Sequence, residues 1–112
     1  MTIFGQEGSG LICIDAEPIC GSSFFNYSNT FDYSSAESGP DYGCLYTPIN
    51  PAWFYFQIDE PGDLQLKIEQ TTVLGTTPDL DVDFIVYGPF NDPRLPCTEE
   101  LNSETRKFGL EF

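Results

Sequence analysis

Three aspartates at every second position, Asp79, Asp81 and Asp83, carry the clearest candidate chemistry in this chain. They lie in "PDLDVDFIVYG", residues 78–88, and lead into a β-branched and aromatic run. In a strand, positions i and i+2 share a face and lie about 6.6 Å apart. Two such carboxylates can bracket one cation only where the strand begins, with loop oxygens completing the shell. The alternative is that the aspartates form the solvent-facing side of a strand and protect its edge from aggregation.

Calcium is the cation that such an oxygen-only site would take, because the chain has no histidine. Glu17 in "DAEP" and Asp41 in "GPDYG" are the further candidate ligands from loops. The alternatives are that Glu17 pairs with a backbone amide and that Asp41 is an ordinary turn residue after a proline. An EF-hand is excluded, because its loop needs Gly at the sixth position, where this sequence has Phe84.

The aromatic run "WFYF" is the candidate for carbohydrate contact. In a strand, Trp53 and Tyr55 share one face, and Phe54 and Phe56 share the other. Exposed aromatic rings stack on sugars, so Trp53 and Tyr55 are the candidate glycan contacts. The alternative is that these two rings belong to the core, as a tryptophan in a small sandwich commonly does. Phe54 and Phe56 then need cover from a loop or a partner.

Four cysteines in a short chain rich in Gly, Pro, Ser and Asn indicate disulfides and an oxidising, secreted or cell-surface location. They are Cys13, Cys20, Cys44 and Cys97. Three pairings are possible, and the sequence does not choose among them. No Cys-x-x-Cys pair is present, which argues against a zinc site.

Composition excludes several functions. The 112 residues include 18 acidic and 4 basic side chains, for a net charge of −14, which argues against nucleic acid as a partner. No apolar stretch of about 18 residues predicts membrane insertion, and the opening "MTIFGQEGSGLI" lacks the basic start and apolar run of a signal peptide. No Ser–His–Asp or Cys–His set and no phosphate loop are present, so we expect no enzymatic activity.

The elements that must position these residues are predicted to be strands. Residues 52–59 are rich in aromatic residues, residues 60–63 ("EPGD") read as a type II turn, and residues 64–70 ("LQLKIEQ") alternate apolar and polar. This pattern predicts a hairpin, and residues 81–88 predict a third strand. We therefore expect one all-β domain over 1–112, an antiparallel β-sandwich. Residues 1–12 are expected to be a loose end, and residues 98–112 a short helix followed by an extended end.

Four motifs in order resemble a domain of secreted, multi-domain surface proteins of Bacteroidetes, found beside gliding-motility and type IX secretion sorting modules. The motifs span roughly residues 13–97 and are "DAEPIC", "SGPDYGCL", "NPAWFYFQIDEPGDLQLKI" and "DVDFIVYGPF". The central part is similar to the pre-peptidase C-terminal domain and other jelly-roll modules. The resemblance implies a jelly-roll-like sandwich, export, and a non-catalytic role in adhesion or glycan contact. Partners would be glycans and other domains or subunits of a surface assembly.

The sequence departs from the family pattern after residue 97. Domains of that family continue after the "GPF" segment through a further cysteine and a hydrophobic strand, whereas this sequence has neither after residue 97. A shortened chain explains this, and so does a homo-oligomer in which a neighbour donates a strand. The sequence thus predicts an adhesive or structural surface module, with calcium as its candidate stabiliser. The alternatives are a carbohydrate-binding accessory module of a larger hydrolase and a self-assembling fibre subunit completed by strand donation.

Overall fold

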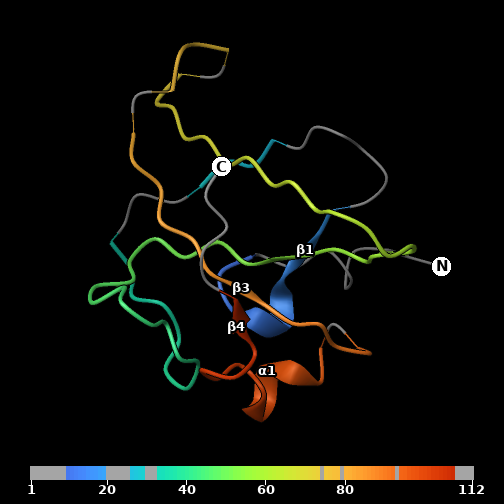
Figure 1. Cartoon of the computed structure of the whole chain (residues 1–112). Helices are drawn as coiled ribbons and strands as arrows, with labels where there is room; N and C mark the ends of the chain where they lie inside the picture. Colours follow the sequence, from blue (N-terminus) through green and yellow to red (C-terminus); the bar gives the residue numbers. More distant parts are fainter. Residues whose placement is uncertain are drawn as a thin grey trace, which may run out of the picture.

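The computed structural model describes residues 10–19, 26–29, 33–73, 75–78, 80–92 and 94–107. Cys20, Asp79 and most of the expected loose end 1–12 therefore lie outside the described residues. The described elements are short (Figure 1). They are the 3-10 helix η2 (Cys13–Asp15), β1 (Glu17–Pro18), β2 (Phe54–Tyr55), β3 (Val86–Tyr87), α1 (Pro96–Glu99) and β4 (Arg106–Lys107).

The first strand pair joins distant parts of the sequence. β1 and β2 run parallel, with Glu17 opposite Phe54. The Glu17 N–H donates to the Trp53 carbonyl at 2.9 Å, and the Ile19 N–H donates to the Tyr55 carbonyl at 2.9 Å. The aromatic run is thus held against the N-terminal segment.

Gly10 extends this contact toward the N-terminus. The Trp53 N–H donates to the Gly10 carbonyl at 2.7 Å. Gly10 has a φ of +71°, and a Cβ there would come within 2.8 Å of the Tyr27 hydroxyl oxygen. Only glycine meets both conditions without a shift of the neighbouring ring.

The chain reverses direction where the hairpin was expected, but strand hydrogen bonds do not join its two limbs. The chain bends at Glu60 and Gly62 and returns along residues 63–70 (Figure 1). The expected type II turn is wrong, because Gly62 does not adopt the positive φ that this turn requires. No strand hydrogen bonds join 52–59 to 64–70, all of which the structure describes. Gln70 instead forms an isolated antiparallel bridge with Leu80. The prediction of a paired hairpin is therefore wrong here, because β2 pairs with β1 and not with its sequence neighbour.

The second strand pair lies near the C-terminal end of the described chain. β3 and β4 run antiparallel, with Tyr87 opposite Arg106. The helix α1 precedes β4 and places Pro96 at its first position, where the missing N–H costs nothing. Within the segment 98–112, the structure describes the end of a short helix, which begins two residues earlier, and the two-residue strand β4. Residues 108–112, where an extended end is expected, lie outside the described residues.

Buried side chains are few and lie close to these elements. Cys13 and Leu101 are each 7% exposed and form the apolar core of the described residues. The two-residue strands do not define sheet layers, so the antiparallel β-sandwich stays a prediction. None of the described helices is long and apolar enough to cross a membrane.

Candidate functional site

Among the described residues, two aromatic side chains pack against Trp53. Its ring stacks on Tyr87 with a centroid distance of 6.3 Å and an interplanar angle of 16°. Tyr42 packs on it at a tilt of 60°, also at 6.3 Å. All three residues are half-buried. These distances are those of favourable aromatic pairs, so the three rings join residues from the 41–45 loop, the segment before β2, and β3. We call this group the Trp53 cluster.

The two tyrosine hydroxyls of the Trp53 cluster donate to backbone carbonyls. Tyr42 Oη donates to the Glu37 carbonyl and Tyr87 Oη donates to the Asp41 carbonyl, each at 2.6 Å. Burial, with the nearby Glu37 carboxylate as a second cause, raises the pKa of Tyr42. Burial and the charge of Asp41 raise the pKa of Tyr87 to about 12, against an opposing effect of Arg106. Both phenols are therefore neutral donors at ordinary pH.

Asp41 makes more contacts with described residues than any other candidate ligand. Its Oδ1 accepts from Arg106 Nη1 and, at 2.8 Å, from the Gly43 N–H. Its backbone N–H donates to the Leu101 carbonyl at 2.8 Å. Asp41 is therefore a turn residue, which is one of the two interpretations of the sequence. Its carboxylate also forms an ion pair with Arg106.

Glu37 connects the Trp53 cluster to the disulfide. Its Oε1 accepts from the Cys13 N–H at the start of η2. Cys13 is bonded to Cys97 across 84 residues of sequence, with a Cα–Cα distance of 5.6 Å. The carboxylate of Glu37 therefore holds the N-terminal helix, while its carbonyl holds Tyr42.

The other described candidate calcium ligands do not lie around a common point. Glu17 is half-buried in β1, and its charge is a secondary cause of the raised pKa of Tyr27, after burial. Asp81 and Asp83 are exposed and alternate with half-buried Val82 and Phe84, as the solvent-facing side of a strand would. Among the described residues, no three His, Cys, Asp or Glu side chains gather in a group that could hold a metal ion.

The candidate glycan contacts take different positions. Trp53 is half-buried in the Trp53 cluster, and Tyr55 is half-buried in β2. Phe54 lies on the other side of the strand and packs edge-on against Tyr27, with a centroid distance of 5.0 Å. A loop residue thus supplies cover for Phe54, which is the arrangement expected if Trp53 faces the interior.

The cysteines divide into a bonded pair and a free thiol within the described chain. Cys13–Cys97 is one of the bonds that the three possible pairings allow. Cys44 is a free, exposed thiol. The sequence predicted disulfides without their pairing, and the structure identifies Cys13 and Cys97 as a bonded pair.

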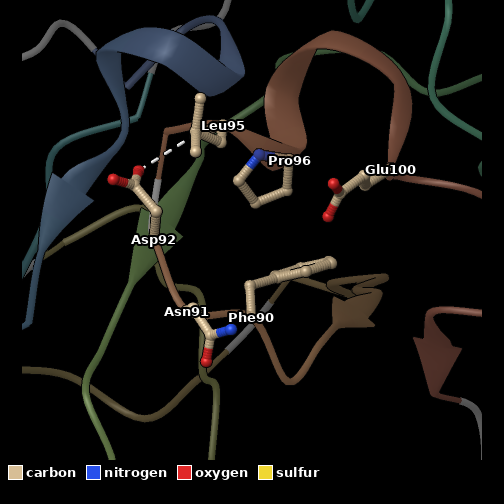
Figure 2. Close-up of a pocket in the computed structure, with 6 residues that line it drawn as sticks. All are labelled: Phe90, Asn91, Asp92, Leu95, Pro96 and Glu100. Carbon is tan, nitrogen blue, oxygen red and sulfur yellow. Dashed lines mark hydrogen bonds between the residues drawn. The ribbon is translucent and has the colours of Figure 1, made fainter.

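A small pocket lies beside α1 (Figure 2). It has a volume of about 170 Å³, below the roughly 300 Å³ at which ligand pockets begin. The Asp92 carboxylate that borders it accepts from the backbone N–H groups of Arg94 and Leu95, at 2.7 and 3.1 Å, and these bonds lower its pKa. The Phe90 ring and the Glu100 carboxylate flank Pro96 on the far side. The pocket is therefore formed by the turn that leads into α1 and by the helix itself.

Sequence reasoning missed Glu37, Tyr42 and Arg106. Each acts through a partner that is distant or set by a loop, and no spacing rule marks such contacts. The signal that was available for Arg106 is the scarcity of basic residues, since 4 of them serve 18 acids. Any half-buried arginine in such a chain is expected to hold a carboxylate.

Comparisons with protein-family models, with curated proteins and with solved structures give no match for this chain. The resemblance of residues 13–97 to a bacterial surface-protein domain therefore stays an expectation.

Proposed function

We propose that this chain is a non-catalytic extracellular module of a bacterial surface protein, with an adhesive or structural role. Its partners would be neighbouring domains or subunits of a surface assembly. The proposal rests on the motif resemblance, on the acidic composition, and on a set of described side chains that holds the fold together.

The observation that carries the proposal is the Cys13–Cys97 disulfide. Such bonds persist in oxidising environments, and they matter most in domains with little buried apolar surface. The described core is small, with Cys13 itself among the buried side chains. The disulfide, the Glu37 contact and the Trp53 cluster together join the two ends of the described chain. A fold that depends on a disulfide is suited to an extracellular module, where the oxidising environment preserves the bond.

Limited proteolysis with and without reductant tests this proposal. We expect the oxidised chain to resist cleavage and the reduced chain to be digested rapidly, because reduction releases a loop of 84 residues. Cys44→Ser is the matched control and should behave as the wild type in both conditions, since Cys44 is free and exposed. Equal digestion rates with and without reductant would remove the observation on which the proposal depends.

A second candidate function, glycan binding, is favoured by a specific feature of residues 33–50. An antiparallel bridge between Ser35 and Ile49 closes this loop, and the Asn50 N–H donates to the Ser34 carbonyl at 2.8 Å. The closed loop carries Tyr33 and Tyr46, which are 74% and 93% exposed. Exposed tyrosines on a pinned loop are suited to stacking on sugar rings. They fit this role better than Trp53, whose ring stacks on Tyr87.

Sedimentation with insoluble polysaccharides tests the glycan hypothesis. We expect Tyr33→Ala and Tyr46→Ala each to reduce the bound fraction several-fold, because a stacked ring contributes about 1 kcal/mol or more. Leu95→Ala is the control, since Leu95 is a 67% exposed apolar side chain beside α1. Equal loss in the control, or retention by both tyrosine variants, would assign any binding to non-specific contact.

A further inference from the structure

One extended segment leaves its backbone unpaired within the described chain. Between Phe56 and Glu69, every residue is described, and no backbone hydrogen bond joins the segment to other described residues. The polar contact within it is the ion pair between Lys67 Nζ and Glu69 Oε1, at 2.6 Å. In Figure 1 the returning limb, residues 63–70, runs well apart from β3, β4 and α1. Backbone N–H and C=O groups without such bonds are, like those of a sheet edge, a template for pairing with another chain.

The side chains of residues 64–70 have the pattern of a strand with one face to cover. Leu64 and Ile68 are 43% and 38% exposed, and Leu66 between them is half-buried. The alternate residues Gln65, Lys67 and Glu69 are all exposed. The apolar face is therefore only partly covered by the chain itself.

Charge indicates which partner fits this edge. Lys67 is the only basic residue before position 94, in a chain with a net charge of −14. Lys67 lies at the centre of residues 64–70, two positions before Glu69 on the same face. A second copy presents the same alternation of Lys67 and Glu69, so the two segments complement each other when they run antiparallel.

The register follows from avoiding like charges across the pair, which destabilise directly opposite positions. An axis at Ile68 places each Lys67 opposite the partner copy's residue 69 and leaves Asp63 opposite a valine position. An axis at Leu66 sets Asp63 against Glu69, and an axis at Lys67 or Glu69 sets that charge against itself. An axis at Gln65 places Pro61, which has no N–H, within the pairing. Parallel pairing in register stacks every charge on its like.

We propose that residues 66–70 pair antiparallel with the same residues of a second copy, about a two-fold axis at Ile68, so that Leu64 and Gln65 lie opposite the partner copy's residues 72 and 71. The two copies then form four alternating charges on one face. On the other face Ile68 lies opposite Ile68, and each Leu66 lies opposite the partner copy's residue 70. Such a contact is isologous, so it closes as a dimer and does not extend into a filament. This inference does not depend on the proposed function.

Sedimentation equilibrium of the full chain tests the proposal, from about 1 μM to about 1 mM protein. A salt concentration near 0.15 M limits the general repulsion between two acidic copies. We expect a concentration-dependent dimer for the wild type. Lys67→Glu and Glu69→Lys should each weaken the dimer at least about tenfold, because each sets like charges opposite one another twice per dimer. Both side chains are exposed, so the monomer should keep its melting temperature.

Mixing the two variants separates pairing between chains from the contact within one chain. A chain with Lys67→Glu and a chain with Glu69→Lys restore both opposite-charge pairs across the axis, although neither restores its own Lys67–Glu69 contact. We expect the mixture to dimerise with close to wild-type affinity. Arg94→Glu is the matched control for the change in net charge and should leave the dimer intact.

Three results would overturn the proposal. They are a wild-type chain that stays monomeric over the whole range, charge variants that dimerise as well as the wild type, and a mixture that dimerises no better than its components.

Discussion

Asp41 and Arg106 stand 65 residues apart in the sequence, and their side chains form an ion pair between the 41–45 loop and β4. The Arg106 side chain is 14% exposed and that of Asp41 is 41% exposed. Tyr87, the residue opposite Arg106 in the β3–β4 pair, donates its hydroxyl to the backbone carbonyl of Asp41. Asp41 is therefore held by both strands of the same pair.

Arg106→Ala is expected to lower the free energy of unfolding by about 1–2 kcal/mol, because it removes a charged hydrogen bond to a half-exposed carboxylate. Arg94→Ala is the control. Arg94 is exposed, so its loss should stay within about 0.5 kcal/mol. Urea unfolding followed by far-UV circular dichroism measures both. A loss at Arg106 no larger than that at Arg94 would show that the ion pair contributes nothing to stability.

Stability should fall at alkaline pH. The pKa of Tyr87 is raised to about 12 in the folded chain, and burial also raises the pKa of Tyr42. A group whose folded pKa lies above its unfolded value stabilises the fold below the unfolded pKa, here about 10. That contribution is lost as the pH rises toward the folded pKa. We therefore expect the free energy of unfolding to be flat up to about pH 9 and to decrease between about pH 10 and 12.

Tyr87→Phe tests the cause of this alkaline loss. The variant lacks the titrating group and should show a shallower decrease with pH, together with a lower stability at neutral pH from the lost bond to the Asp41 carbonyl. Tyr46→Phe is the control, because the Tyr46 side chain is 93% exposed. Identical pH profiles for Tyr87→Phe and the wild type would contradict the assignment.

Removal of the Cys13–Cys97 bond should cost about 4.5 kcal/mol by the chain-entropy relation for a loop of this length. The double variant Cys13→Ser/Cys97→Ser tests this in guanidinium unfolding, with Cys44→Ser as the control that keeps the bond. Peptide mapping without reductant should recover the segments around Cys13 and Cys97 as one linked species. It should also find Cys44 alkylated in the folded protein. A linked species that contains Cys44 instead would overturn the pairing.

Calcium is the candidate stabiliser that the sequence predicts, and the melting temperature tests this hypothesis. Asp81 and Asp83 are exposed, the Asp41 carboxylate is paired with Arg106, and the described acids form no group of three around a common point. A thermal melt in millimolar calcium against excess chelator is the measurement. A bound ion at 100 times its dissociation constant adds about 2.7 kcal/mol, which is on the order of 10 °C for a domain of this size.

A rise of that size would assign calcium to the 79–83 segment. Asp81→Asn and Asp83→Asn should then each abolish the rise, whereas Asp15→Asn, which changes an acid of η2 outside the candidate set, should leave it intact.

The sequence by itself determined the features that depend on local chemistry. Pro61 and Gly62 predict the reversal of direction at 60–63, where the chain bends, although Gly62 does not adopt the positive φ of the expected type II turn. The alternation around Asp81 and Asp83 predicts which of these side chains face water, and the structure agrees. The acidic composition and the cysteines likewise follow from counting. Each of these features arises within a few residues of the chain.

The tertiary structure decided every contact between distant residues. The partner of β2 is β1 and not the neighbouring 64–70 segment, Cys13 pairs with Cys97, and Asp41 meets Arg106. A carboxylate in a turn satisfies the same local pattern whether it binds an ion, an amide or an arginine. The choice is made by which groups the packing of Trp53 against Tyr42 and Tyr87 brings within reach. Packing depends on the sum of many weak contacts across the chain, and no local spacing encodes that sum.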